Sequence, residues 1–453
     1  MTIDEGNKNK LDGDFGYLKC HHSNLCNSVS EEQLKNLSAL KTDEERFCFV
    51  YQLPTVHEHE IKASNYGKNG EEAKLLKEEG NKFFQNQNYK VAVQSYTRSI
   101  LKTPWEKDSS QDIAVVLANR SAAFYHLQKF QLALQDIELV LTFEYPLELR
   151  YKVMDRKSRC LLALKQLKDA LEAFKGTLTA LDSAKLPVER KKKWQMDIQI
   201  MIAMLIKNKI LINEPLETPE NAILPSISGQ CNRRYLSASS AVTIQETEEA
   251  GRYAEAGEDI KVGDTLIVEP AFVTVLLAAV PCPQCNRVAF CSWKCQKEAL
   301  DTHHKIECTI LEALWESGAS IIFCKRYAFD CDVVRSSKKY DPTDYCTVYN
   351  LVGHSSTRTP QDFLLRSDIA VLLFRCLKVA GFFNKQPTEA IFIGGLLLRH
   401  LQLLQFNAHE VSELQIEAPQ KISSGRNIFL GGGLFPTLAL FNHSCDPGIV
   451  RYL

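Results

Sequence analysis

The sequence predicts a multidomain α+β protein, in which an α-helical repeat region precedes a β-rich domain that is split by a cysteine-rich segment and a helical insertion. Three observations lead to this fold class. Residues 72–184 show helical apolar spacing with an internal repeat. Two short segments rich in β-branched residues, Ser240–Ile244 and Asp264–Glu269, are typical of strands. Closely spaced cysteine and histidine pairs then follow within residues 282–308, as in a structural metal site.

The bulk composition describes a protein with room for several domains. The chain has 453 residues, of which 45% are apolar and 24% are charged. Its 54 basic residues are balanced by 55 acidic ones, which argues against direct binding of nucleic acid or an anionic membrane. Neither a signal peptide nor an apolar run long enough to span a membrane is present. Fifteen cysteines without a secretion signal indicate a reducing compartment, so we expect the cytoplasm and leave the nucleus open.

The first 68 residues are polar, and their apolar spacing is sparse. A small cluster of Cys20, His21, His22 and Cys26 could be read as a zinc site, but its spacing is loose and no partner pair lies nearby. We therefore expect a mobile arm here rather than a metal site.

Residues 69–184 carry the repeat. Its small and aromatic positions recur as Gly80-x2-Phe83 with Ala92-x3-Tyr96, as Ser121-x2-Phe124 with Ala133 and Ile137, and as Ser158 and Leu161 with Ala170 and Phe174. This pattern resembles the tetratricopeptide repeat, in which small residues allow two antiparallel helices to approach. Three units are about the minimum for a stacked solenoid. Residues 185–229 are expected to add a capping helix and a linker rich in proline, serine and glutamate.

The first helices of such repeats line a groove, so their exposed residues should indicate the ligand. At those positions the sequence has Lys77, Asn81, Asn119, Lys152 and Arg156. Two lysines, an arginine and two amides suit a carboxylate ligand. The set resembles the clamp with which co-chaperones bind the acidic Glu-Glu-Val-Asp tail of heat-shock chaperones, which implies chaperone tails as partners. The alternative is an ordinary solvated helix face, since these residue types are common on exposed helices.

The cysteine-rich segment holds three ligand pairs, Cys282-x2-Cys285, Cys291-x3-Cys295 and His304-x3-Cys308. Zinc requires four such ligands in tetrahedral geometry, so the segment predicts zinc binding. The segment resembles a MYND zinc finger. In that family the pairs interleave, which implies one complete site from Cys282, Cys285, His304 and Cys308. Cys291 and Cys295 would form half of a second site, because the remaining pair of the family pattern is absent. We expect one tightly bound zinc and a second site that is empty or weak.

The end of the chain carries the most specific motif, Asn442-His443-Ser444-Cys445-Asp446-Pro447. It resembles the core motif of SET-domain lysine methyltransferases, and the whole layout is similar to the repeat-bearing branch of the SMYD (SET and MYND) family. The resemblance implies that S-adenosyl-L-methionine is bound by Gly251, Arg252 and Tyr253 in a β-turn, by Asn407, and by Asn442 and His443. Cys445 would be a free thiol.

The expected parts are an arm at 1–68, tetratricopeptide repeats at 69–184, a cap and linker at 185–229, the first SET piece at 230–271, the finger at 281–308, a helical SET insertion at 309–430, and the SET core motif at 431–453.

The resemblance implies transfer of a methyl group to a lysine of a protein substrate, by positioning and desolvation more than by acid–base chemistry. The family places its active-site tyrosine downstream of the Asn-His motif, beyond Leu453, and Tyr452 lies too close to the motif to replace it. No catalytic residue can therefore be assigned, and we expect impaired catalysis. The alternative is a non-enzymatic adaptor that binds acidic chaperone tails through its repeats.

Overall fold

The computed structural model confirms the predicted fold class, with helical repeats, a zinc-finger segment and small β-sheets. No helix in the described part of the chain is both long and apolar enough to span a membrane. The structure describes residues 17–62, 68–104, 110–207, 225–248, 251–270, 273–276, 280–290, 293–317, 340–384, 389–415, 426–444 and 447–451.

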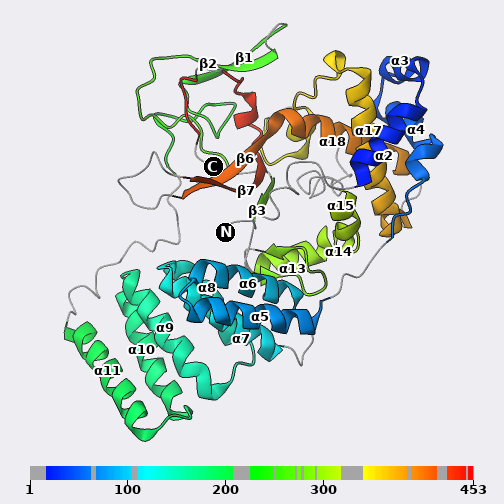
Figure 1. Ribbon diagram of the computed structural model, residues 1–453. Coiled ribbons are helices and arrows are strands. Elements are labelled where there is room, and N and C mark those ends of the chain that lie inside the picture. Colours follow the sequence, from blue (N-terminus) through cyan, green and yellow to red (C-terminus); the bar gives the residue numbers. More distant parts are fainter. Residues whose placement is uncertain are drawn as a thin grey trace. The chain divides into compact units, whose positions relative to one another are not determined.

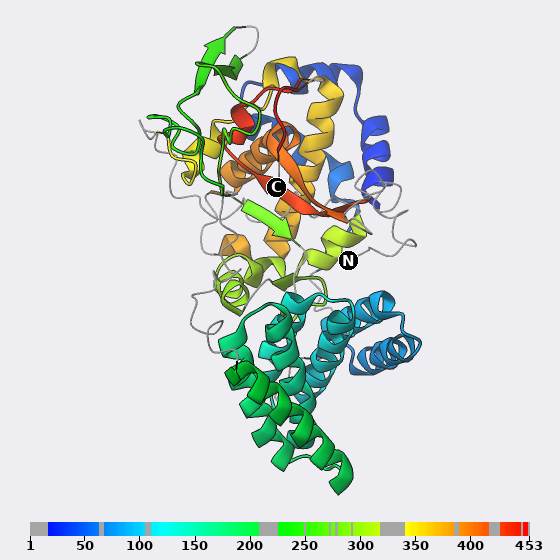
Figure 2. The ribbon, with the colours of Figure 1, turned by 90° about the vertical axis from the view of Figure 1, so that its left-hand side faces the viewer.

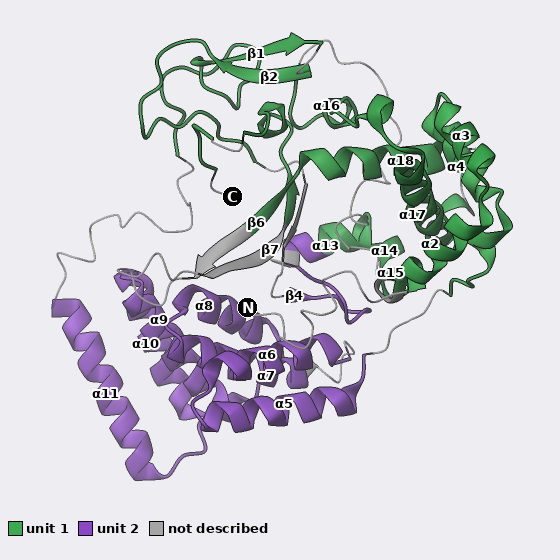
Figure 3. Ribbon diagram, turned by 45° about the horizontal axis from the view of Figure 1, so that its top comes forward, with its two compact units in different colours: residues 1–64, 223–277, 297–453 green, residues 65–222, 278–296 purple. Residues whose placement is uncertain are grey.

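The chain divides into two compact units, which are described separately (Figure 3). The first contains residues 1–64, 223–277 and 297–453. The second contains residues 65–222 and 278–296. The boundary between the two units falls inside the helix Trp293–Asp301, which belongs to the finger segment at 280–308.

The second unit is a stack of helix pairs followed by one more helix (Figures 1 and 2). Its elements are α5 (Gly70–Gln85), α6 (Tyr89–Lys102), α7 (Ser110–His126), α8 (Phe130–Thr142), η3 (Leu147–Leu149), α9 (Arg150–Ala163), α10 (Leu167–Asp182) and α11 (Val188–Lys207). Each pair turns in the same way, since Gln87, Gln128 and Lys165 all adopt positive φ after the first helix. In each turn the next amide donates to a carbonyl five residues earlier, as in a Schellman motif.

Small residues allow the paired helices to approach, as the repeat pattern predicts. A Cβ atom on Gly80 would lie 2.6 Å from the ring of Tyr96. The corresponding small residues of the later units, Ser121 and Ser158, are fully buried. An ion pair joins α7 to α8, because the Arg120 guanidinium donates to both carboxylate oxygens of Asp136 at 2.9 and 2.7 Å. The second unit is therefore held together by contacts between neighbours in the sequence.

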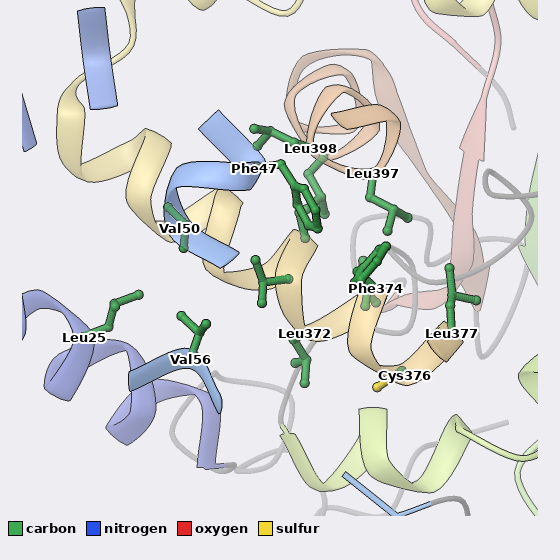
Figure 4. Packing of buried hydrophobic residues seen from close by; sticks show 14 of the residues in the cluster. Leu25, Phe47, Val50, Val56, Leu372, Phe374, Cys376, Leu377, Leu397 and Leu398 are labelled. Atoms are coloured by element: carbon green, nitrogen blue, oxygen red, sulfur yellow. The ribbon is translucent and has the colours of Figure 1, made fainter. Parts of the chain in front are cut away.

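The N-terminal residues 17–62 are not a mobile arm, and that expectation is wrong for this segment. They form α2 (Tyr17–Ser28), α3 (Glu31–Ala39), α4 (Asp43–Tyr51) and η1 (Pro54–His57). These helices share one hydrophobic core with α17 (Pro360–Val379) and α18 (Ala390–Asn407) of the helical insertion. Figure 4 shows Phe47 of α4 beside Phe374 of α17 and Leu398 of α18. Short amphipathic helices whose partners lie far along the chain leave little periodic signal, which explains the error.

Small sheets complete the first unit. Strands β1 (Val242–Thr247) and β2 (Gly251–Ala256) form an antiparallel hairpin. A separate antiparallel sheet has the order β3–β7–β6, from β3 (Val273–Leu276), β7 (Arg426–Leu434) and β6 (Ala408–Gln415). The expected strand Asp264–Glu269 is instead an irregular segment with an isolated bridge from Ile267 to Ala238. The glycine run that begins at Gly431 is not a separate turn but the end of β7, paired with β3 and β6.

The remaining helices are short, apart from one in the finger. The finger contains β4 (Val280–Pro281), β5 (Ala289–Phe290), α13 (Trp293–Asp301) and α14 (His304–Glu307). The insertion adds α15 (Leu311–Ser317), α16 (Tyr345–Tyr349), η5 (Ser355–Thr357) and η6 (Phe382–Asn384). Helix α18 runs directly into β6, and η9 (Leu438–Leu440) follows β7.

Candidate functional site

The finger brings four metal-binding side chains together. Ligand atoms of Cys282, Cys285, His304 and Cys308 all lie within 4.8 Å of one another, and all four residues are buried. Among the described residues they are the one group of three or more histidine, cysteine or acidic side chains that could hold a metal ion. Three sulfurs and an imidazole at this spacing fit a tetrahedral zinc ion.

Backbone geometry prepares the first cysteine pair for a metal. The amides of Gln284 and Cys285 donate to the Cys282 sulfur at 3.3 and 3.4 Å. The Cys282 amide donates to the carbonyl of Val288 at 2.9 Å, which closes the loop between β4 and β5. These hydrogen bonds of the loop therefore fix the position of the Cys282 sulfur.

Glu307 lies beside the histidine ligand and was missed by the sequence reading. Its carboxylate lies 3.6 Å from Nδ1 of His304, and both side chains are buried. Of the expected second half-site, Cys295 is half-buried on α13 and Cys291 lies outside the described residues. The weak second site stays a prediction.

In the repeats, the predicted groove residues lie on the first helix of each pair. Lys77 and Asn81 are one turn apart on α5, Asn119 is on α7, and Lys152 and Arg156 are one turn apart on α9. The Nδ2 of Asn119 donates to Oδ1 of Asn81 at 3.1 Å. This hydrogen bond brings side chains from the first helices of units one and two into contact.

The five groove residues differ in how they are held. Tyr96 donates to Oδ1 of Asn81 at 2.8 Å, which orients the amide. Arg156 uses Nη1 to bind the Ala118 carbonyl at 3.0 Å and the Ser121 hydroxyl at 2.8 Å. Burial lowers the pKa of Arg156, although nearby groups such as Tyr145 and Cys160 oppose this shift. Lys152 is exposed and Lys77 is half-buried. The predicted groove residues therefore include one anchored guanidinium and two lysines.

In the first unit, β2, which begins at Gly251, contacts η9, which precedes the final motif. Leu440 of η9 shares a small core with Tyr235 and Ala238, against which Ile244 of β1 packs. Gly251 has a φ of +65°, and among the described residues no heavy atom outside its chain neighbours lies within 4 Å of where its Cβ would be. The backbone at this turn is therefore open to a close ligand.

A half-buried carboxylate fixes the approach to the final motif. Glu269 accepts hydrogen bonds from the amides of Thr437 and Leu438 at 2.9 to 3.0 Å. The Thr437 hydroxyl also meets the Tyr340 hydroxyl at 3.0 Å. Burial raises the pKa of Glu269, and the hydrogen bonds from Thr437 and Leu438 oppose that shift. The sequence reading missed this network, although an acidic residue at the end of an apolar segment was a visible signal.

The six predicted cofactor residues have different environments. Asn442 and His443 are exposed beyond η9, and Tyr253 lies in β2 opposite Gln245. Arg252 donates to the Asn350 carbonyl at 2.8 Å. Asn407 is buried, and its amide donates to the carbonyls of Val352 and Leu403 at 2.9 and 2.7 Å. Its side-chain donors therefore fix the end of α18. Cys445 and Tyr452 lie outside the described residues.

Comparison with known proteins agrees with this layout. The family model described as the MYND finger matches residues 275–308. The human protein-lysine N-methyltransferase SMYD4 is 25% identical in an alignment that covers 84% of this chain and 60% of the human protein. The resemblance to the repeat-bearing SMYD family is confirmed. This chain spans 60% of the length of that SMYD relative.

The repeats have relatives of their own outside the SMYD proteins. Human tetratricopeptide repeat protein 4 is 38% identical over 101 residues, which are 22% of this chain and 24% of that protein. The solved first TPR of Spaghetti (RPAP3), bound to the HSP90 peptide SRMEEVD, is 22% identical. It covers 31% of this chain and 96% of that chain, with a TM-score of 0.24.

Proposed function

We propose that this protein is a protein-lysine N-methyltransferase of the SMYD type that uses S-adenosyl-L-methionine. The observation that carries the proposal is the contact between β2, which begins at Gly251, and η9, which precedes Asn442 and His443. Relatives named protein-lysine N-methyltransferase align across 84% of this chain, which supports the same activity.

The residues present fit the cofactor at this place. Gly251 leaves room for backbone contact, and the exposed side chains of Asn442 and His443 offer hydrogen-bonding groups for an adenosine. When bound, S-adenosylmethionine supplies an electrophilic methyl group. The work of the chain is then to bind and orient, with Glu269 holding the amides of Thr437 and Leu438 so that the motif keeps its position.

Calorimetric titration of S-adenosylmethionine into the zinc-loaded chain tests the proposal. We expect saturable one-to-one binding that Asn442→Ala weakens about tenfold or more, which corresponds to about 1.4 kcal/mol. Asn36→Ala is the matched control, because Asn36 is an exposed asparagine on α3 of the same unit. An Asn442→Ala protein that binds as tightly as the wild type would refute the assigned site.

A second function follows from the groove: we propose that the repeats bind the acidic C-terminal tails of heat-shock chaperones. Its supporting observation is the hydrogen bond between Asn119 and Asn81, which brings the amides of two repeats together. Lys152 and Arg156 lie one turn apart on the first helix of the third repeat. A tail with a terminal carboxylate and acidic side chains would match these charges.

Titration of a Met-Glu-Glu-Val-Asp peptide, followed by fluorescence anisotropy, tests the groove. Lys152→Ala should weaken binding about tenfold, because a charge-assisted hydrogen bond contributes about 1.5–3 kcal/mol. Lys168→Ala on the outer helix α10 is the control and should have no effect. Equal binding of the C-terminally amidated peptide would contradict recognition of a terminal carboxylate. Tail binding without any binding of S-adenosylmethionine would favour the non-enzymatic adaptor.

A further inference from the structure

A cysteine, a histidine and an aspartate are aligned where α2 meets α17. His22 and Cys26 lie one turn apart on α2, and Asp368 projects from α17. The Cys26 sulfur is 3.4 Å from Nε2 of His22, and Nδ1 of His22 is 3.1 Å from a carboxylate oxygen of Asp368. The helix is held in place by Leu25, which is fully buried in the shared core (Figure 4). The three groups therefore form one chain of contacts.

The chemistry of the carboxylate fixes the tautomer of the imidazole. Burial alone would raise the pKa of Asp368, but hydrogen bonds from His21 and His22 lower it overall, so the carboxylate is ionised at neutral pH. An ionised carboxylate can only accept hydrogen bonds. The hydrogen of a neutral His22 must then reside on Nδ1, and the lone pair on Nε2 faces the Cys26 sulfur. His21 occupies the other oxygen of Asp368 at 3.3 Å.

We infer that Cys26 is a base-assisted reactive thiol that takes small uncharged electrophiles, with His22 as the base and Asp368 as its orienting group. A nucleophile in contact with a base that a third group orients is the general arrangement of covalent catalysis. Cys26 is exposed, so a reagent can reach it. Only 1% of the Asp368 side chain is exposed, which keeps the orienting group in one position.

The reaction step can be written with a simple alkylating reagent such as iodoacetamide. The sulfur forms a bond to the reagent's methylene carbon as the carbon–iodine bond breaks and iodide leaves. The thiol proton moves to Nε2 of His22, and the Asp368 carboxylate stabilises the resulting imidazolium. Desolvation and the charge of Asp368 raise the pKa of the Cys26 thiol, so little thiolate forms without the base. The reactivity therefore depends on His22.

This arrangement does not suit a metal ion. The two nitrogens of His22 face two different partners, whereas metal ligands must converge on one point. In the described part of the chain, the group that meets the distance requirement for a metal is the one in the finger. The segment that the sequence reading left as an arm with a loose cysteine–histidine cluster is better described as a positioned thiol.

The test measures iodoacetamide alkylation of the 453-residue chain at pH 7, site by site, by mass spectrometry. Cys20 is an internal control, because it is exposed on the same helix. We expect Cys26 to react about tenfold faster than Cys20, in line with the lower range of general-base catalysis. His22→Gln should reduce the rate at Cys26 to that at Cys20. His21→Gln removes the neighbouring imidazole but keeps the three aligned groups, and should change the rate at Cys26 little.

Two results would overturn the inference. One is a wild-type Cys26 that reacts no faster than Cys20, and the other is equal loss of rate in the His21 and His22 variants. Undocking of α2 is detected separately by labelling of Cys376, which is fully buried in the same core. A slow Cys26 in a His22→Gln protein whose Cys376 stays protected supports the base. If His22→Gln exposes Cys376, the pH profile of the alkylation rate at Cys26 in the wild-type protein decides whether His22 assists the reaction. A rate at pH 6–7 above that of Cys20 supports assistance, and matching profiles refute it.

Discussion

The repeats and the N-terminal segment 17–62 both consist of helices, yet the repeats pack through contacts that are local in the sequence and the N-terminal helices pack through long-range contacts. In the repeats, each helix from α5 to α11 packs on the next helix in the sequence. Helix α4 packs instead on α17 and α18, and the Gln402 side chain donates to Asp43 across 359 positions of the chain. Local packing repeats a pattern that can be read from the sequence. Distant packing requires only that each short helix has one apolar face, and such a face does not identify its partner.

Each region contains a buried cysteine that reports on its own packing. Cys160 on α9 and Cys376 on α17 are both fully buried. Burial raises the pKa of each thiol to about 12, so both are protected from alkylation in the folded protein. Labelling of the two sites separates the stability of the repeats from that of the shared core.

The largest effect should come from Phe47→Ala, which removes a buried ring that lies 5.0 Å from the ring of Phe374. Phe→Ala substitutions in cores cost about 3–5 kcal/mol. Labelling of Cys376 should therefore accelerate about 100-fold or more, while Cys160 stays protected. Leu75→Ala, at a 67% exposed position, is the control. Unchanged protection of Cys376 would mean that α4 is not needed for this core.

A smaller loss of stability, and one that depends on pH, is expected for Asp368→Asn in the core shared by the N-terminal helices and the insertion. The hydrogen bonds from His21 and His22 lower the pKa of Asp368 overall, against the effect of burial. The stabilisation that the Asp368 carboxylate contributes is therefore present above the pKa of an unfolded aspartate, about 3.9. It is lost as pH falls through the lower pKa of the folded protein. At pH 7 the variant should be less stable by about 1.5–3 kcal/mol, as for hydrogen bonds to a charged group.

Urea unfolding at pH 7 and at pH 3, followed by circular dichroism, measures this difference. It should shrink at the lower pH, because the wild-type carboxylate is then losing its charge. A difference that stays constant between the two pH values would show that the charge of Asp368 does not matter.

The repeats can be perturbed alone by Gly80→Ala. The new methyl group would lie 2.6 Å from the Tyr96 ring, and such overpacking costs about 1–3 kcal/mol. Labelling of Cys160 should accelerate, and Cys376 should stay protected. Gly176→Ala is the matched control, because its methyl group meets the flexible end of Met154 at 2.9 Å, and Ala is a better helix former than Gly. Equal destabilisation by both variants would contradict the special role of Gly80.

The smallest effect should be a gain in stability. Gln87 and Gln128 have φ values of 59° and 57° in the turns between paired helices, where glycine is favoured. Replacing either with glycine should stabilise the repeats by about 0.5–1 kcal/mol, because the strain of a side chain in this conformation is relieved. Gln199→Gly, inside α11, should destabilise by about 1 kcal/mol. Thermal unfolding of the three variants shows whether each substitution raises or lowers the stability of the repeats.

The sequence was most informative where the chemistry is local. The spacing of Cys282 and Cys285, and of His304 and Cys308, indicated two ligand pairs, and the family arrangement implied that they share one site. The structure brings these four side chains together. The repeat pattern placed Asn81 and Asn119 on the first helices of consecutive units, and they are hydrogen-bonded. By contrast, Glu269 supports the final motif from a segment more than a hundred positions earlier, which no periodicity could indicate.

By itself, the sequence determined the order of the parts, the zinc-binding pairs and the register of the repeats, because each depends on residues that are close along the chain. Only the tertiary structure decided that residues 17–62 belong to the core of the helical insertion, since their partners on α17 and α18 lie more than 300 positions away. It also decided that Asn407 fixes a helix end through two backbone carbonyls. Side chains from distant segments become neighbours only when hydrophobic burial closes the long loops between them, and that closure depends on the whole chain.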